Sequence, residues 1–548
     1  MSDPSVNIAA ALSVWAQRTP DRLAVVEAVR GSIREYESLT FSELDSRAGR
    51  YAAGLHRVGI RKGVRTVLMV TPGLEFFALV FALFRVGATM VLIDPGIDKR
   101  ALKACLAEVE PEAFVGVPLA HVARLVFRGA LASVHTLVTV GPRWFWGGHR
   151  LRDLLDTEAR DCEETEASDL AAILFTSGST GVPKGAMYTQ GIFSSQVRML
   201  QELYEFGDDE ADLSTFPMFA LFLAALGVTS VIPDMDARHP ADANPRKLLA
   251  AIEDYGCTNM FGSPALLDTF STYGQRRSVH LRTLRRVLSA GAPVRPEILR
   301  RMRGLLPHGV QVFTPYGATE SLPVANVGSE TILGETERLT ARGAGVCVGY
   351  PVEGMTVRTI VVTDAPIPEW SDDLLVPPGT VGEITVRGDV VTPAYYGRPQ
   401  QTALAKIDDA GRVVHRMGDL GTFDELGRLW MCGRKSHRLE TSAGPVFTIP
   451  VEMIFNADKD VWRTALVGVG EPGAQVAVLL VEPFAHARTP APVLLKRLVQ
   501  RRDEVPAAGA VQHIEIFPGS FPVDIRHNAK INRELLTVWA NRHLGSLR

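Results

Sequence analysis

One stretch of the sequence decides the fold: Thr176-Ser177-Gly178-Ser179-Thr180-Gly181-Val182-Pro183-Lys184-Gly185. The apolar run at 170–175 predicts a buried strand before it, and the residues after Gly185 lead toward a predicted helix. Glycines let the backbone turn its amides toward one point, hydroxyl groups add further hydrogen bonds, and Lys184 adds a full positive charge. This combination predicts a loop that binds the phosphates of a nucleotide.

Two other interpretations of this stretch are a Walker A loop and a plain surface turn. A Walker A loop has glycine directly before its lysine, and Pro183 stands at that position here. A turn rich in glycine and serine explains neither Lys184 nor the apolar run that precedes the stretch. The phosphate-binding interpretation therefore accounts for more of the residues.

Length and composition predict a soluble globular protein with several structural units. A chain of 548 residues is too long for one core, and its 46% hydrophobic and 22% charged residues are ordinary. A net charge of −3 gives no indication of nucleic-acid binding. The five cysteines are scattered, which fits a reducing cytosol, and the N-terminus has no signal-peptide pattern. We therefore expect a cytoplasmic protein without a transmembrane segment, in which the apolar stretch 74–93 forms a core helix and a strand.

The order of the predicted elements indicates an α/β fold. In the first part of the chain, strands at 23–26, 64–70, 89–93, 113–117 and 133–140 alternate with helices at 74–86 and 99–107. This alternation predicts a parallel sheet with right-handed crossovers. Residues 186–330 predict a second α/β unit, and the short strands at 345–430 are typical of a small β-barrel. Residues 437–548 predict a small α+β domain.

Three later segments carry residue types that suit a nucleotide. Tyr316-Gly317-Ala318-Thr319-Glu320 offers an aromatic face, a hydroxyl group and a carboxylate. Asp419, within Gly418-Asp419-Leu420-Gly421, can accept hydrogen bonds from two ribose hydroxyls. The small residues 289–293 follow a predicted strand and leave space for a flat ring, although a plain turn would explain them equally well.

The first stretch and the Tyr-Gly-Ala-Thr-Glu segment resemble motifs of the adenylate-forming superfamily, which includes acyl-CoA synthetases, adenylation domains of peptide synthetases and luciferases. The resemblance extends over residues 8–540, with the motifs in the expected order. It implies ATP and Mg²⁺ as cofactors. It also implies a large N-terminal domain (1–434) of two α/β subdomains plus a small β-barrel, followed by a small mobile α+β domain (435–548) that carries a catalytic lysine.

The resemblance implies a role for each matched position. Lys530 is the expected catalytic lysine, which bridges the substrate carboxylate and the phosphate, and Thr319 is expected at the α-phosphate. Glu320 and Thr180 are the expected Mg²⁺ ligands. The implied ATP-binding residues are Thr176, Ser177, Gly178, Ser179, Thr180, Gly181, Lys184, Gly291, Ala292, Pro293, Tyr316, Gly317, Asp419 and Arg434.

The substrate wall is expected to include Met218, Phe219, Ala220, Phe261 and Gly262. Members of the superfamily often have histidine where Ala220 stands, so a more apolar acyl pocket is one interpretation, and ordinary core packing at 218–223 is the other. Two further departures are Ser436, where members that rotate their small domain have Asp or Lys, and Ala529, which replaces a glycine.

These departures resemble one branch of the superfamily, the β-lactone synthetases of bacterial long-chain olefin biosynthesis. The branch implies that a long-chain 2-alkyl-3-hydroxy fatty acid is adenylated and that its 3-hydroxyl then attacks the carbonyl to give a β-lactone, with His527 accepting the hydroxyl proton. It also implies association with a condensing enzyme, a reductase and a β-lactone decarboxylase. The alternatives are a long-chain acyl-CoA ligase, an acyl-AMP ligase that loads a carrier protein, and a scaffold without activity.

Overall fold

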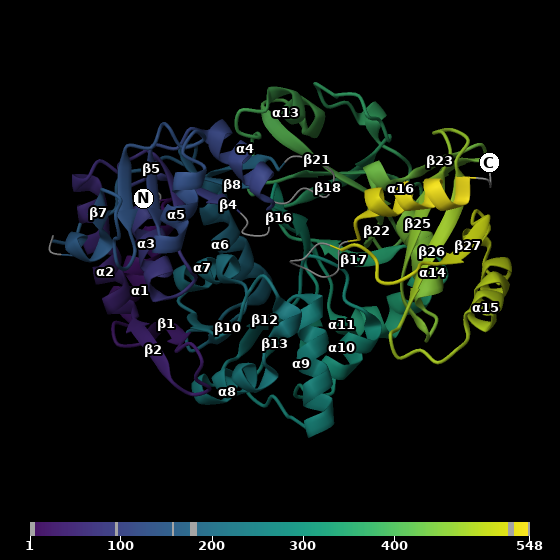
Figure 1. The fold of residues 1–548 in the computed structure, drawn as a ribbon, viewed down its shortest axis with the longest axis horizontal. Coiled ribbons are helices and arrows are strands. Elements are labelled where there is room, and N and C mark those ends of the chain that lie inside the picture. The colour runs from purple at the N-terminus through teal and green to yellow at the C-terminus, as the bar shows by residue number, and fades with distance from the viewer. Residues whose placement is uncertain (1–5, 94–96, 156–157, 176–182, 524–530, 546–548) are drawn as a thin grey trace.

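The computed structural model describes residues 6–93, 97–155, 158–175, 183–523 and 531–545 (Figure 1). These residues form two mostly parallel sheets, a third antiparallel sheet, and a C-terminal unit with its own small sheet. In Figure 1 the first sheet lies at the left in blue, and the C-terminal unit lies at the right in green to yellow. The two are separated by the second and third sheets.

The first sheet has the strand order β7-β6-β5-β3-β4-β8-β9. All neighbouring strands are parallel except β8 and β9, which form an antiparallel pair on either side of the predicted phosphate loop. The parallel sheet that the sequence predicted is therefore confirmed. Its elements are β3 (Arg65–Met69), β4 (Thr89–Ile93), β5 (Ala113–Gly116), β6 (Thr136–Thr139), β7 (His149–Arg150), β8 (Leu170–Phe175), β9 (Gly185–Thr189), α2 (Phe41–Arg57), α3 (Leu74–Arg85), α4 (Lys99–Val109), α5 (Pro118–Val126) and α6 (Gln190–Tyr204).

The second sheet has the order β14-β13-β12-β10-β11-β1-β2, and only β1 and β2 pair antiparallel. Strands β1 and β2 come from the start of the chain and the other five from residues 211–313, so the N-terminal segment completes one edge of this sheet. The elements are β1 (Leu23–Ala28), β2 (Tyr36–Thr40), β10 (Ala211–Ser214), β11 (Thr229–Ile232), β12 (Asn259–Phe261), β13 (Arg286–Leu288), β14 (Gln311–Phe313), α1 (Ile8–Arg18), α7 (Pro217–Ala225), α8 (Pro245–Tyr255), α9 (Pro264–Arg277) and α10 (Pro296–Arg303).

Helices α2 and α3 show why the local sequence forms these elements. Thr40 caps α2: its hydroxyl accepts a hydrogen bond from the Glu43 N–H, and the Glu43 carboxylate accepts one from the Thr40 N–H, which satisfies two amides at the helix start. Helix α3 is buried along its whole length, including Arg85, which pairs with Asp45. The prediction of a core helix at 74–86 is therefore confirmed. None of the helices in the described part of the chain has both the length and the apolar character needed to span a bilayer.

The third sheet corrects the prediction of a small β-barrel. Its strand order β15-β16-β17-β22-β21-β19-β18 is open, because within the described ranges the two end strands do not pair with each other. The outer edge of β18 instead pairs with residues 374–376, which covers the edge. The elements are β15 (Tyr316–Ala318), β16 (Ser321–Asn326), β17 (Val346–Pro351), β18 (Thr356–Ile360), β19 (Gly382–Arg387), β20 (Lys406–Asp409), β21 (Arg412–Phe423), β22 (Leu429–Arg434), α11 (Ser329–Thr331), α12 (Glu337–Thr340) and α13 (Pro399–Ala405).

The C-terminal unit has apolar clusters drawn only from residues 439–544. Strand β26 pairs antiparallel with β25 and parallel with β27, and helices cover both faces of this small sheet. Arg533 ties α16 to α14 through the Glu452 carboxylate. The elements are β23 (Leu439–Thr441), β24 (Gly444–Val446), β25 (Val461–Val469), β26 (Val476–Pro483), β27 (His513–Ile516), α14 (Thr448–Asn456), α15 (Ala491–Glu504) and α16 (Arg533–Leu544).

The buried ion pair between Arg416 and Glu383 generates a stability prediction. Both side chains are 1% exposed, with 2.6 Å between Nη2 and Oε2, and Arg416 also donates to the carbonyls of Thr363 and Ala365. Removing Arg416 leaves the buried Glu383 carboxylate with Lys435, 3.1 Å away, as its remaining cationic partner. Arg416→Met is therefore expected to lower the free energy of unfolding by about 3 kcal/mol, the low end of the range for a broken buried pair, in urea titrations followed by fluorescence.

The control for this experiment is Arg198→Ala. Arg198 pairs with Asp389 at 3.2 Å, but both side chains are more than half exposed. Its loss should cost about 0–1 kcal/mol, because water screens an exposed pair. Equal effects of the two substitutions would contradict the role given to the buried pair.

Candidate active site

Tyr316, Asp419 and Arg434 meet in the third sheet. The Tyr316 hydroxyl donates to Oδ2 of Asp419 at 2.7 Å, and Nη1 of Arg434 lies 3.0 Å from Oδ1 of the same carboxylate. Asp419 and Arg434 are directly opposite each other on the antiparallel strands β21 and β22. Burial and the nearby Asp419 charge raise the pKa of Tyr316, and Asp419 raises the pKa of Arg434. Three predicted ATP-binding residues thus form one hydrogen-bonded cluster.

Gly433 allows β22 to reach this cluster. Its φ of +133° favours glycine, and a Cβ atom there would lie 2.7 Å from Oγ1 of Thr448 on α14. A larger residue would therefore push α14 away from the strand that carries Arg434. The close approach couples the position of Arg434 to the first helix of the C-terminal unit.

Glu320 is a half-buried carboxylate at the turn between β15 and β16. Its Oε1 accepts a hydrogen bond from the Tyr395 hydroxyl at 2.6 Å, and its backbone carbonyl accepts from the N–H and hydroxyl of Thr392, at 2.9 and 3.2 Å. A carboxylate has about four acceptor sites, so one bond from Tyr395 leaves capacity for a cation. The donor set fits the hard oxygen ligands that Mg²⁺ prefers.

The strands that flank the phosphate loop are tied to Glu320. Strand β9 pairs with the segment around Tyr395, through the Met187 N–H to the Ala394 carbonyl at 3.1 Å and an isolated bridge between Ala186 and Tyr395. The Tyr188 hydroxyl donates to the Thr319 carbonyl. Nζ of Lys184 lies 4.7 Å from the centre of the Tyr395 ring. One tyrosine therefore contacts both the lysine that ends the phosphate loop and the predicted metal ligand.

Comparisons with known proteins agree with this geometry. A family model described as AMP-binding enzyme matches residues 12–396. The chain belongs to the AMP-binding enzyme family. It is 50% identical over 98% of both chains to an olefin beta-lactone synthetase of Stenotrophomonas maltophilia (strain K279a), and 49% identical over 97% of both to one of Xanthomonas campestris pv. campestris. The structure of the amide bond synthetase McbA from Marinactinospora thermotolerans shares the fold, with a TM-score of 0.79, 24% identity, and coverage of 98% of this chain and 99% of that one.

Several predicted residues of this AMP-binding enzyme lie outside the described ranges. They are Thr176, Ser177, Gly178, Ser179, Thr180, Gly181, His527 and Lys530. Phe175, at the end of β8, and Gly185, at the start of β9, are opposite each other in the antiparallel pair on either side of residues 176–184. Gly291, Ala292 and Pro293 lie between β13 and α10, and Gly291 has a φ of +97° that favours glycine. Gly317 lies on β15 beside Tyr316.

The predicted acyl wall is divided between two apolar clusters. The Phe261 ring lies 5.0 Å from the Phe219 ring and 5.7 Å from the Phe216 ring, in a cluster that α7 forms with the ends of the second sheet. Gly262 follows Phe261, and a Cβ there would lie 2.9 Å from Leu267. Ala220 belongs instead to the large core around α3 and is 1% exposed, which fits the core-packing interpretation for this residue. Nothing is described of the Met218 side chain.

Sequence analysis missed Tyr395, Lys406 and His415, which surround Glu320. Nζ of Lys406 donates to Oγ1 of Thr392 at 3.1 Å and lies 6.0 Å from the centre of the Tyr395 ring. His415 donates a hydrogen bond from Nδ1 to the Ala405 carbonyl, 3.0 Å away. No local motif marks these residues. The only sequence signal is a lysine and a histidine placed within otherwise apolar strand patterns.

Burial dominates the electrostatics of this group. It lowers the pKa of Lys406 to about 7, against the opposing effect of Glu320, and it lowers the pKa of His415 to about 3, with help from Lys406. Burial alone would raise the pKa of Glu320, but His415, the Tyr395 hydroxyl and Lys406 together lower it. Because His415 is neutral and Lys406 is only partly protonated at neutral pH, the hydrogen bond from the Tyr395 hydroxyl is the direct contact that favours the ionised form of Glu320 there.

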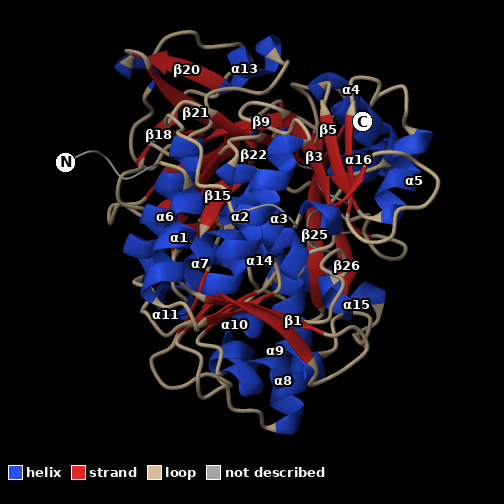
Figure 2. Cartoon of the chain, turned by 90° about the vertical axis from the view of Figure 1, so that its left-hand side faces the viewer, coloured by secondary structure: helices blue, strands red, loops and turns tan. Residues whose placement is uncertain are grey.

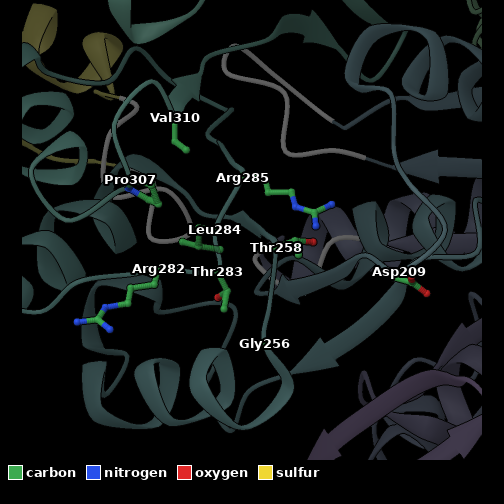
Figure 3. A pocket seen from close by; sticks show the side chains of 9 residues that line it. All are labelled: Asp209, Gly256, Thr258, Arg282, Thr283, Leu284, Arg285, Pro307 and Val310. Carbon is green, nitrogen blue, oxygen red and sulfur yellow. The ribbon is translucent and has the colours of Figure 1, made fainter.

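The hollow in Figure 3 lies away from this site. It has a volume of about 550 Å³ and is lined by segments that precede β10, β12, β13 and β14, including Asp209, Thr258, Arg285 and Val310. These are the amino ends of parallel strands, whereas ligands of open α/β sheets bind at the carboxyl ends. The hollow is therefore not the candidate active site.

Removing one hydroxyl tests the role of Tyr395. Tyr395→Phe deletes the hydrogen bond to Glu320 and keeps the ring beside Lys184. We expect adenylate formation, measured as ATP–pyrophosphate exchange, to fall about 10–100-fold with a higher Mg²⁺ requirement, because a partner of a metal ligand sets its position and basicity. Tyr396→Phe is the matched control, since Tyr396 packs in the cluster around Val67 and Ile173. Equal activities of the two variants would contradict this role.

The low pKa of Lys406 predicts a pH dependence of stability. In the folded chain Lys406 loses its proton near pH 7, whereas an ordinary lysine keeps it to about 10.5. The unfolded chain therefore binds more protons between these values, and this residue makes stability rise with pH, by up to about 1.4 kcal/mol per pH unit. Lys406→Met should flatten this rise in urea titrations, and the exposed Lys103→Met should not. An unchanged slope in Lys406→Met would contradict the assignment.

Proposed function

We propose that this AMP-binding enzyme uses ATP and Mg²⁺ to adenylate a long-chain 2-alkyl-3-hydroxy fatty acid and then closes the acid to a β-lactone. The observation that carries this proposal is the identity of about half the residues, over nearly the whole of both chains, with two olefin beta-lactone synthetases. The cluster around Tyr316, Asp419 and Glu320 supports the adenylation step independently of that likeness.

The described residues support a nucleotide orientation along the third sheet. Asp419 and Arg434 would hold the ribose hydroxyls, and Tyr316 with residues 291–293 would face the adenine. Lys184 would meet the phosphates together with Thr176, Ser177, Gly178, Ser179, Thr180 and Gly181. Glu320 and Thr180 would hold Mg²⁺, which when bound neutralises phosphate charge and favours departure of pyrophosphate.

In the first half-reaction, a carboxylate oxygen of the substrate forms a bond to the α-phosphorus, and the bond to the pyrophosphate oxygen breaks. The carboxylate is already ionised at neutral pH, so this step needs no general base. Lys530 would stabilise the charge that develops between carboxylate and phosphate, and Thr319 would orient the α-phosphate. The protein contributes mainly positioning and charge stabilisation.

In the second half-reaction, the 3-hydroxyl oxygen forms a bond to the acyl carbonyl carbon, and the bond to the AMP oxygen breaks. The hydroxyl proton passes to His527. The products are the β-lactone, AMP and pyrophosphate, and the oxygen that the acid loses leaves with AMP. Closing a four-membered ring requires the hydroxyl to be held in line with the carbonyl, which favours an enclosed apolar site such as that around Phe219 and Phe261.

The domain arrangement and the partners are part of the proposal. Residues 1–434 would form the unit that binds ATP and the acid, and residues 435–548 a mobile unit that carries Lys530. The separate apolar clusters within 439–544 support this division. We also propose a cytoplasmic enzyme that works beside a condensing enzyme, a reductase and a β-lactone decarboxylase, because its substrate must be supplied and its product consumed within olefin biosynthesis.

Product analysis by mass spectrometry tests the function. The protein receives ATP, Mg²⁺ and a racemic long-chain 2-alkyl-3-hydroxy acid, with and without CoA. We expect a product lighter than the acid by one water, formed together with AMP and independent of CoA. A thioester that forms only with CoA would identify an acyl-CoA ligase, and AMP release without either product would indicate an acyl-AMP ligase that requires a carrier protein. Either result would contradict the proposal.

Two variants separate the half-reactions. Lys530→Ala should abolish pyrophosphate release from acid and ATP. His527→Ala should still release pyrophosphate but should convert preformed acyl-adenylate to lactone more slowly, by about 10²–10⁴-fold for the loss of a general base. Full pyrophosphate release by Lys530→Ala, or normal lactone formation by His527→Ala, would overturn the role given to that residue.

A further inference from the structure

One outer surface of the first sheet exposes large apolar side chains. They come from helix α5 and from the segment after β6, and we call them the edge patch. In Figure 2, α5 lies at the periphery of the molecule, and it contacts β5. The members of the edge patch, with their exposed fractions, are Leu119 (74%), Leu125 (36%), Val126 (76%), Trp144 (53%) and Phe145 (76%).

The outward position of the two aromatic rings is built into the local structure. Trp146 is buried, donates from Nε1 to Oγ1 of Thr139 at 2.9 Å, and stacks on His121 of α5 at 5.1 Å. The rings of Trp144 and Phe145 lie 5.5 and 5.2 Å from the Trp146 ring. The buried tryptophan thus joins the segment to α5, while the two preceding rings face solvent next to the helix.

The segment that carries the edge patch, residues 113–152, has only arginines as charged side chains if its histidines are left aside. Residues 113–152 contain no Asp or Glu, although the whole chain has a net charge of −3. The nearest acids on either side are paired: Glu112 lies 3.3 Å from Arg65, and Asp153 lies 2.8 Å from Arg150. The arginines within the stretch are Arg124, Arg128, Arg143, Arg150 and Arg152.

We propose that the edge patch attaches the protein to the surface of an anionic lipid bilayer. Trp, Phe and Leu side chains insert at the boundary between headgroups and acyl chains, and arginines bind the lipid phosphates above it. A surface with charges of one sign is complementary to a partner of the opposite sign, and anionic lipid headgroups present that sign beside an apolar layer that suits the exposed rings. The attachment is peripheral, since the described helices do not span a bilayer.

The location of the edge patch gives the attachment a use. Helix α5 and the 144–146 segment follow the carboxyl ends of β5 and β6, which are parallel to β8, the strand that leads into the phosphate loop. Strands β5 and β6 lie three and four strand spacings from β8, or about 15–20 Å. A bilayer at this edge would supply an acid with two long alkyl chains close to the site. This use rests on the proposed function, but the lipid attachment itself does not.

Vesicle binding by the full chain tests the proposal. Co-sedimentation compares vesicles of phosphatidylcholine alone with vesicles of phosphatidylcholine and phosphatidylglycerol in equal parts. The wild type should bind the anionic vesicles and release them as salt is raised. Trp144→Ser combined with Phe145→Ser, and separately Arg128→Glu, should each weaken binding at least about ten-fold, since each removes apolar insertion or cationic attraction.

Matched controls remove equally exposed groups elsewhere. They are Leu426→Ser, where the side chain is 62% exposed, and Arg412→Glu, where it is 61% exposed. Both should bind vesicles like the wild type, and all variants should keep normal ATP–pyrophosphate exchange, which reports on folding. The proposal is overturned if the wild type stays in solution with anionic vesicles, or if the edge-patch variants bind like the controls. It is also overturned if the patch instead joins two copies of the chain, seen as a dimer that Trp144→Ser dissociates.

Discussion

An ionised carboxylate that is partly withdrawn from water is costly unless other groups compensate its charge, and the half-buried Glu320 is such a carboxylate. The Tyr395 hydroxyl bonds directly to it, Thr392 holds its backbone, and Lys406 supplies a nearby positive charge. These partners come from a segment more than seventy residues further along the chain. The need to compensate one charge therefore brings the segment 392–406 against the β15–β16 turn, and the same segment pairs with β9 at the exit of the phosphate loop.

With the function proposed above, this arrangement would separate activation of the carboxylate from recognition of its alkyl chains. The polar groups expected at the nucleotide lie on the third sheet and on the turn that enters it: Tyr316 is hydrogen-bonded to Asp419, which pairs with Arg434, and Glu320 is hydrogen-bonded to Tyr395. The apolar cluster around Phe216, Phe219 and Phe261 is built by α7 and the second sheet. Residues in that cluster can change size without removing a hydrogen bond from the nucleotide site. This division explains how one family can activate many different acids.

The sequence allowed correct prediction of features with a local signal. Apolar runs in the sequence located β4, β8 and β13 at their observed positions. The cluster of Tyr316, Asp419 and Arg434 followed from motif resemblance. The group around Tyr395, Lys406 and His415 could not be predicted, because its members are ordinary residues in sequence and acquire a role only when strand pairing brings them to Glu320.

Strand β9 and the open third sheet illustrate the same limit. Residues 185–189 lead into helix α6 as predicted, but they themselves form strand β9, which pairs antiparallel with β8 and which the sequence did not indicate. Short strands separated by glycine and proline predict a barrel and an open sheet equally well. What distinguishes them is the pairing of β18 with the 374–376 segment, a contact between residues that no periodic pattern connects.

The contacts of Lys435 bear on where the C-terminal unit would rotate relative to the rest of the chain. Lys435 follows Arg434, the predicted ribose-binding residue. Its ammonium group contacts the Glu383 carboxylate at 3.1 Å and the Thr363 carbonyl at 3.0 Å, and Arg416 contacts the same two groups. Three residues later, Arg438 meets Asp364 in a pair whose aspartate is mostly exposed. A torque on the C-terminal unit would break this weaker link first. If the C-terminal unit rotates as proposed above, the axis of rotation would lie beyond Lys435, and Arg434 would stay with the large unit while the remainder of the chain turns.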